Sequence, residues 1–184
     1  MARFPDCELW DFSLAVYGRE GVAPACLALQ ARHGADVNLL LYVCWQAASG
    51  RGAIGDDELA RAQAVVARWH EEVVRGLRQV RMRLKREPHL ASLDRAGDLR
   101  KRVQAAELEA EHIEQLALFG LAPSARDESI SLAARAAAAA QGALSYLLSL
   151  GAKPDAEDRV NIAALLAGCF PELAPGEIRR LVEA

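Results

Sequence analysis

The stretch that decides the fold reads Gly34-Ala35-Asp36-Val37-Asn38-Leu39-Leu40-Leu41-Tyr42-Val43-Cys44-Trp45. It is the most apolar run in the chain, and every position from Leu39 to Trp45 is apolar or aromatic. A helix built from this run has no side suited to water, so it belongs in the middle of a core. The run is much shorter than the roughly 20 residues that a membrane span requires. We therefore expect the rest of the chain to pack around this helix.

The composition favours an ordinary all-helical protein. Of the 184 residues, 52% are hydrophobic and 26% are charged, which is typical of globular domains. Alanine and leucine dominate while aromatic and β-branched residues are scarce, a balance that favours helices over a sheet. The net charge of −3 gives no general attraction to nucleic acid or to membranes.

Apolar spacing, capping residues and helix breakers predict seven or eight helices. The expected helices cover residues 6–17, 22–33, 37–48, 56–87, 96–119, 127–150, 156–170 and 174–182. Pro88 is expected to end the fourth helix, because proline disfavours helix in the residue before it. Asp36 is well placed to cap the third helix.

The fourth and fifth helices carry apolar residues at alternating spacings of three and four, which is typical of two helices packed side by side. The fourth has Leu59, Ala62, Val66, Trp69, Val73, Gly76 and Val80. The fifth has Leu99, Val103, Ala106, Ala110, Ile113 and Ala117. We expect a single-domain helical bundle with a long antiparallel hairpin around the buried third helix. Residues 1–120 would form the core and residues 121–184 a helical extension packed on it.

The cysteines and the N-terminal residues both indicate a cytoplasmic protein. Cys7, Cys26, Cys44 and Cys169 form no Cys-x-x-Cys pair and sit among apolar residues. We interpret them as reduced core side chains. The first residues lack the apolar segment of a secretory signal.

Positive charge is concentrated at the expected tip of the hairpin. Residues 75–102 carry ten bases against three acids, whereas both flanking regions are acidic. Such a patch could contact phosphates, although no aromatic residues interleave with its bases. The simpler interpretation is a solvated helix end whose arginines pair with acids elsewhere. The candidate basic patch consists of Arg75, Arg78, Arg81, Lys85 and Arg100.

The sequence contains no complete set of metal ligands. Glu109 and His112 form one Glu-x-x-His, but a di-iron bundle site needs a second copy and two further carboxylates. Next to His70, the adjacent acids Glu71 and Glu72 point in different directions on a helix. We therefore expect neither a metal nor another cofactor, and we identify no catalytic residue.

Polar residues gather at the start of the expected third helix, where the chain is otherwise apolar. Buried polar groups must find partners, so one interpretation is a hydrogen-bond network that fixes helix packing. The other is a small-molecule pocket in which His33 acts as acid or base and Asp36 orients it. The candidate cluster consists of Gln30, His33, Asp36, Asn38 and His70.

Three blocks of sequence resemble a family of small proteobacterial all-helical proteins known only as a domain of unknown function. The blocks are Trp10-Asp11-Phe12-Ser13-Leu14-Ala15-Val16-Tyr17, Cys26-Leu27-Ala28-Leu29-Gln30 and Gly34-Ala35-Asp36-Val37-Asn38-Leu39-Leu40-Leu41. Trp69 and residues 73–85 fit the same pattern, so the resemblance covers residues 8–118. It implies a bacterial cytoplasmic protein and transfers no activity, cofactor, partner or catalytic residue.

A helical bundle hosts binding, enzymatic and scaffolding functions alike, so the fold does not choose between them. The absence of a complete catalytic set favours a non-enzymatic interaction or adaptor protein with a protein partner or a homo-oligomeric state, and no membrane contact. The first alternative is a small-molecule binder or enzyme that uses the polar cluster. The second is RNA or ribosome contact through the basic patch.

Overall fold

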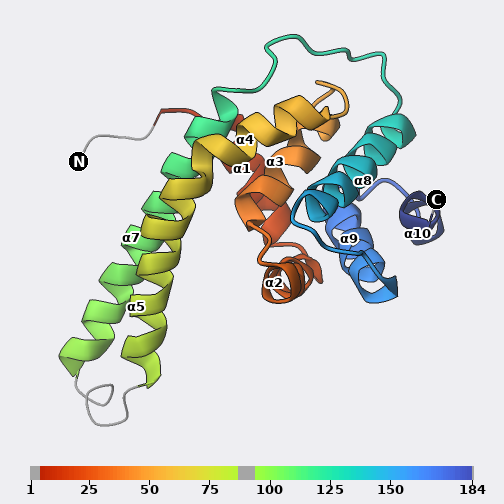
Figure 1. The fold of residues 1–184 in the computed structure, drawn as a ribbon. Coiled ribbons are helices and arrows are strands. Elements are labelled where there is room, and N and C mark those ends of the chain that lie inside the picture. Colours follow the sequence, from red (N-terminus) through yellow and green to blue (C-terminus); the bar gives the residue numbers. More distant parts are fainter. Residues whose placement is uncertain (1–4, 87–93, 184) are drawn as a thin grey trace.

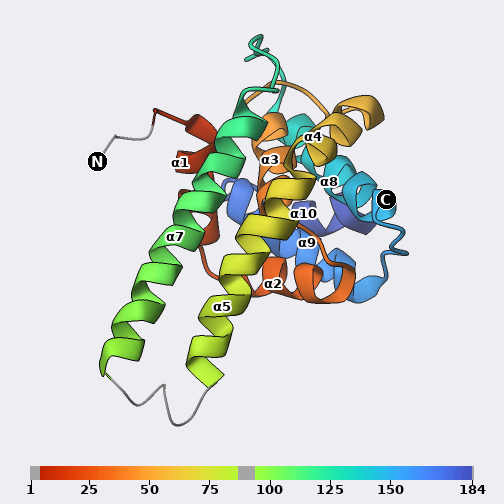
Figure 2. The same ribbon diagram turned by 60° about the vertical axis from the view of Figure 1, so that its left-hand side comes forward.

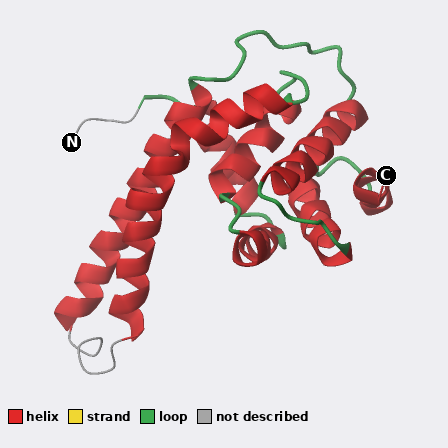
Figure 3. Ribbon diagram, viewed as in Figure 1, coloured by secondary structure: helices red, strands yellow, loops and turns green. Residues whose placement is uncertain are grey.

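The computed structural model describes residues 5–86 and 94–183, and every regular element within these residues is helical (Figures 1 and 3). The elements are α1 (Glu8–Tyr17), α2 (Val22–His33), α3 (Val37–Ala48), α4 (Asp56–Trp69), the π-helical turn η1 (His70–Val74), α5 (Arg75–Arg86), α7 (Asp94–Phe119), α8 (Leu132–Ser149), α9 (Ala156–Cys169) and α10 (Pro175–Glu183). With α4, η1 and α5 counted as one continuous helix, the described residues form eight helices, as predicted. The expected end of that helix near Pro88 lies outside the described residues.

Helix α3 lies at the centre of the fold, as its sequence predicts. All ten residues from 38 to 47 are buried, because α8, α1, α7 and α9 pack around them. Helix α8 approaches α3 closely at Gly142, where an added Cβ atom would be 2.5 Å from Val43 Cγ1. The third helix is therefore the common packing partner of both halves of the chain.

The C-terminal helices complete the same core. Helix α9 packs along α2, and α10 packs on α9 and α8 (Figure 2). All four cysteines are buried and free, which confirms their expected role as core side chains. Within the described residues, no helix is both long and apolar enough to cross a membrane.

Helices α5 and α7 form an antiparallel hairpin that projects from the rest of the molecule (Figures 1 and 2). The predicted apolar seam of its first arm is buried at Leu59, Ala62 and Val66 and half-buried at Trp69, Val73 and Gly76. It is wrong at its last position, because Val80 is 48% exposed, and it omits Val74, which is buried. The cause is η1, because a π-helical turn accommodates an extra residue and rotates everything that follows. In α5, Arg78 and Arg81 are half-buried in place of the predicted Val80.

The predicted seam of α7 is correct in part, because Ala110 is buried and Val103 and Ala106 are half-buried. Leu99 and Ile113 are more than 40% exposed. The five buried positions are the predicted Ala110 and four that were not predicted, Glu107, Glu114, Gln115 and Leu118. Three of these five are polar, so a pattern of apolar residues could identify only part of this face.

Candidate functional site

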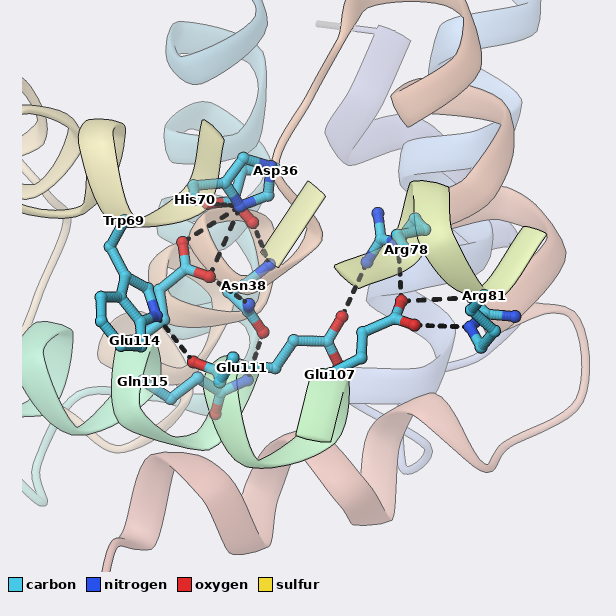
Figure 4. A network of polar contacts seen from close by, with 11 residues as sticks. Asp36, Asn38, Trp69, His70, Arg78, Arg81, Glu107, Glu111, Glu114 and Gln115 are labelled. Carbon is cyan, nitrogen blue, oxygen red and sulfur yellow. Dashed lines mark hydrogen bonds and ion pairs between the residues drawn. The ribbon is translucent and has the colours of Figure 1, made fainter. Parts of the chain in front are cut away.

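Three of the five residues in the predicted polar cluster meet at the start of α3. They are Asp36 and Asn38 at the helix start and His70 in η1, and α7 adds Glu114 and Gln115 (Figure 4). The side chains of Asp36 and Glu114 are 6% and 0% exposed, so both carboxyl groups are effectively removed from solvent. Segments far apart in the sequence thus place two acids, a histidine and two amides in one buried cluster.

Asp36 is fixed on both sides by backbone contacts. Its Oδ1 accepts a 2.8 Å hydrogen bond from the Asn38 backbone N–H and so caps α3, as predicted. Its own N–H donates to the hydroxyl of Tyr146 in α8, also at 2.8 Å. These contacts leave Oδ2 directed toward His70 Nδ1, 3.2 Å away.

Asn38 organises the other side of the cluster. Its Nδ2 donates to Glu114 Oε2 at 2.9 Å, and its Oδ1 accepts from Gln115 Nε2 at 2.8 Å. One asparagine therefore holds one oxygen of Asp36 through its backbone and one oxygen of Glu114 through its side chain. The two remaining carboxylate oxygens, Asp36 Oδ2 and Glu114 Oε1, both lie 3.2 Å from His70 Nδ1.

The π-helical turn η1 positions His70 against α7. The preceding residue, Trp69, donates its Nε1–H to the backbone carbonyl of Ala110 at 3.0 Å, which anchors the turn (Figure 4). Single π-helical turns inside longer helices occur often at functional sites. Here the turn brings a half-buried imidazole between two carboxyl groups.

The two carboxyl groups are difficult to ionise together. Burial raises the pKa of Asp36 well above its ordinary value, and the neighbouring Glu114 raises it further. Burial also raises the pKa of Glu114, against the opposing effect of its close contacts with Asp36 and Asn38. Like charges held close together in a site removed from water favour a bound proton or cation.

The structure separates His33 and Gln30 from this cluster. His33 Nε2 lies 2.8 Å from Asp158 Oδ1, at the N-terminal capping box of α9. Arg32 reaches the same region and pairs with Asp155 and Glu157. His33 thus joins α2 to α9, which contradicts its predicted pairing with Asp36. Gln30 is half-buried on α2, where its backbone carbonyl accepts the Gly34 N–H.

A pocket of about 150 Å³ lies beside the cluster, between α1, α2, α3, α5 and α7. Asn38 and Gln115 belong to both the cluster and the pocket wall. The polar part of the wall also includes Ser13, Arg78 and Glu111. The remaining lining is apolar or aromatic and consists of Leu14, Tyr17, Leu27, Val37, Leu41 and Leu108.

Arginines of the predicted basic patch neutralise the glutamates on the inner face of α7. Arg78 donates to Glu107 at 2.9 Å and to Glu111 at 2.7 Å, and Arg81 also binds Glu107 (Figure 4). Burial raises the pKa of Glu111 despite this pairing. Arg78 and Arg81 therefore face the neighbouring helix and do not form an open phosphate-binding stripe.

The other basic residues are arranged differently. Arg75 pairs with Glu71 one turn earlier on the helix surface. Lys85 and Arg100 line a polar pocket of about 230 Å³ between the arms of the hairpin, together with Leu84, Ala96 and Gly97. The basic patch therefore has three parts: Arg78 and Arg81 pack against α7, Arg75 forms a surface ion pair, and Lys85 and Arg100 line this pocket.

Among the described residues, three side chains lie close enough together to bind one metal ion, and they are not the Glu109–His112 pair considered from the sequence. One ligand atom from each of Asp36, His70 and Glu114 lies within 4.8 Å of the other two. Glu109 is exposed, and His112 stacks on Trp10 with ring centroids 4.3 Å apart. Burial raises the pKa of the Cys26 thiol to about 12, which disfavours a nucleophilic or ligating thiolate there.

Sequence reasoning missed Glu111, Glu114 and Gln115. The available signal was the spacing of Glu107, Glu111 and Glu114 by four and three, which places three acids on one face of a helix. A row of acids on a helix usually faces water, so this spacing was not informative without the arginines and polar groups opposite it.

The comparisons with known proteins agree with the resemblance noted in the sequence. No curated protein and no solved structure matches the chain. One family matches residues 8–118, more than half of the chain. This range includes all five residues of the buried cluster, whereas Tyr146, which accepts the Asp36 N–H, lies outside it. The chain therefore belongs to the family described as "Protein of unknown function (DUF2390)".

Proposed function

We propose that this protein binds a small molecule in the pocket beside the start of α3. The observation that carries this proposal is the pocket wall, which combines Asn38, Gln115, Arg78 and Glu111 with an apolar side. Buried polar groups converging on an otherwise apolar pocket are typical of ligand sites. Two atoms of lining residues, Ser13 Oγ and Gln115 Oε1, are buried without a hydrogen-bond partner among the described residues.

The pocket limits the ligand to a small amphipathic molecule. About 150 Å³ is only half the lower limit of roughly 300 Å³ for drug-sized ligands. The amides, Ser13 and the Arg78–Glu111 pair suit a head that both donates and accepts hydrogen bonds. The leucines and Val37 suit a short hydrocarbon body. The expected ligand is therefore a small molecule with a compact polar group at one end and a short hydrocarbon group at the other.

The test is a ligand-observed and protein-observed NMR screen of small amphipathic fragments against the full chain. We expect binding fragments to shift the side-chain amide signals of Asn38 and Gln115. Leu108→Trp, at a half-exposed position in the pocket wall, should weaken binding at least tenfold, about 1.4 kcal/mol. Leu148→Trp is the matched control, because Leu148 is similarly exposed on α8. Equal affinity of both variants, or fragments that bind without shifting these amides, would contradict the proposal.

A protein partner for the projecting hairpin is the second candidate function. Val80 and Met82 of α5 and Leu99 of α7 are each at least 36% exposed. They lie on the hairpin that projects from the rest of the molecule (Figure 1). A double variant, Val80→Lys with Leu99→Lys, should lose a partner captured by the wild-type chain from native lysate. Recovery of the same partner by wild type and variant would exclude the hairpin as the contact surface.

The contacts of the basic patch support RNA binding less well than they support the two functions above. Three of the five residues in the basic patch are paired with glutamates. Phosphate binding by the patch would require these pairs to open, and it would weaken steeply as salt increases.

A further inference from the structure

We propose that Asp36, His70 and Glu114 form a binding site for one divalent first-row metal ion such as Zn²⁺ or Mn²⁺. This proposal is independent of ligand binding in the neighbouring pocket. It rests on the geometry of three donor atoms: Asp36 Oδ2, Glu114 Oε1 and His70 Nδ1 (Figure 4).

The distances from His70 Nδ1 to the two carboxylate oxygens match those between ligands around a common ion. His70 Nδ1 lies 3.2 Å from each carboxylate oxygen. Ligands bound at about 2.1 Å with angles near 90° would be about 3 Å apart. All three donor atoms lie within 4.8 Å of one another, so side-chain adjustments would bring them around one ion.

The second coordination shell is already in place. The backbone N–H of Asn38 donates a hydrogen bond to Asp36 Oδ1, and the side-chain amide of Asn38 donates one to Glu114 Oε2. Only the oxygens that face His70 remain available to an ion. Outer hydrogen bonds of this kind orient ligands in known metal sites.

One of these oxygens lacks a hydrogen-bond donor. Asp36 Oδ2 is buried and accepts no hydrogen bond from the described residues, while His70 Nδ1 is engaged by Glu114. A buried carboxylate oxygen without a donor is costly. A cation would satisfy it, and this observation is separate from the clustering of acids.

Charge and donor type indicate the class of ion. Two ionised carboxylates and a neutral imidazole carry −2 together, which a divalent cation balances. A nitrogen donor beside carboxylates suits Zn²⁺, Fe²⁺ or Mn²⁺ better than the all-oxygen shell of Ca²⁺. Three protein ligands leave positions for water, as in catalytic zinc sites.

The test is metal binding by the full chain after treatment with a chelator and removal of the chelator. Isothermal titration with ZnCl₂ and with MnCl₂ should give one site per chain, and the ion should raise the Tm. Glu114→Gln and His70→Gln should weaken binding at least tenfold and abolish the metal-dependent increase in Tm. His33→Gln is the matched control, because His33 is the other half-buried histidine paired with a buried aspartate.

Glu114→Gln also separates lost binding from lost folding. Glutamine keeps the shape of the side chain and can still accept from Asn38, so the metal-free variant should be at least as stable as metal-free wild type. The proposal is overturned if neither ion binds wild type. It is equally overturned if binding persists unchanged in Glu114→Gln and His70→Gln, or is lost as much in His33→Gln.

Discussion

At the scale of single residues, two buried tyrosines offer a controlled comparison. The hydroxyl of Tyr146 accepts the Asp36 N–H, whereas the hydroxyl of Tyr42 has no hydrogen-bond partner among the described residues. Tyr146→Phe should cost about 1–3 kcal/mol of unfolding free energy, because it leaves a buried N–H unpaired. Tyr42→Phe should be neutral or stabilising. Urea unfolding of both variants measures the difference, and equal losses would contradict the role of Tyr146.

Glu107 gives a prediction for the dependence of stability on pH. Burial raises the pKa of Glu107, but hydrogen bonds from Arg81 and Arg78 outweigh burial and hold that pKa below its ordinary value. A lowered folded-state pKa contributes stability above the unfolded pKa, near 4.3, and this contribution is lost as the pH falls through the folded pKa. Glu107→Gln should therefore cost about 2 kcal/mol at pH 7.

The cost of Glu107→Gln should shrink as the pH falls below about 4.3. Urea unfolding at several pH values between 7 and 3 measures the change. Glu109→Gln serves as the control, because Glu109 is exposed on the same helix; its effect should be small at every pH. A constant difference between wild type and Glu107→Gln would show that the arginine pairs contribute no pH-dependent stability.

At the scale of elements, replacing two helical glycines distinguishes the effect of close packing on stability from the effect of helix propensity. Gly142 in α8 lies against Val43 and Ile54, whereas a Cβ at Gly76 in α5 would meet nothing within 4 Å. Gly142→Ala should destabilise the protein by about 1–3 kcal/mol, because α8 must move away from α3. Gly76→Ala should stabilise it by about 0.5–1 kcal/mol through helix propensity. Thermal unfolding monitored by circular dichroism tests both, and a stabilising Gly142→Ala would contradict the close contact.

The elements also show what the sequence can and cannot reveal. The burial of α3 and its cap at Asp36 were predictable, because an unbroken apolar run and a capping residue are local signals. The seams of α5 and α7 were only partly predictable, because η1 shifts the helical phase and glutamates occupy inward positions of α7. Glu107 is tolerated there only because Arg78 and Arg81 lie opposite, and that pairing joins residues more than 25 positions apart.

The candidate site was partly predictable for the same reason. Asp36, Asn38 and His70 stood out because polar residues beside an apolar run require partners. Their partners Glu114 and Gln115 come from α7, and Tyr146 comes from α8. His33 was misassigned because its partner, Asp158, belongs to a helix 125 residues away. Only the three-dimensional arrangement identifies partners at such separations.

At the scale of the whole molecule, the family-matched residues do not enclose their own core. The match ends at residue 118, yet α8 packs along α3 and supplies Tyr146 to Asp36. Apolar residues of α8, α9 and α10 belong to the same buried cluster as those of α3. Without these helices, an unbroken apolar helix would meet water along one side. We therefore expect residues 1–124 alone to lack cooperative folding.

A protease site can be inserted between Ser124 and Ala125, which are both exposed. Cleavage there tests whether the fold needs a continuous chain or only the contacts between the two halves. The cleaved but unseparated protein should keep its helical signal and a cooperative melt, because α8 to α10 remain in contact with α3. The purified fragment 1–124 should lose the cooperative transition and bind a hydrophobic dye. If that fragment instead melts cooperatively near the Tm of the intact chain, residues 1–120 are an independent domain and α8 to α10 only cover it. The expected loss follows from α3 being apolar on every side, because such a helix requires neighbours all around it.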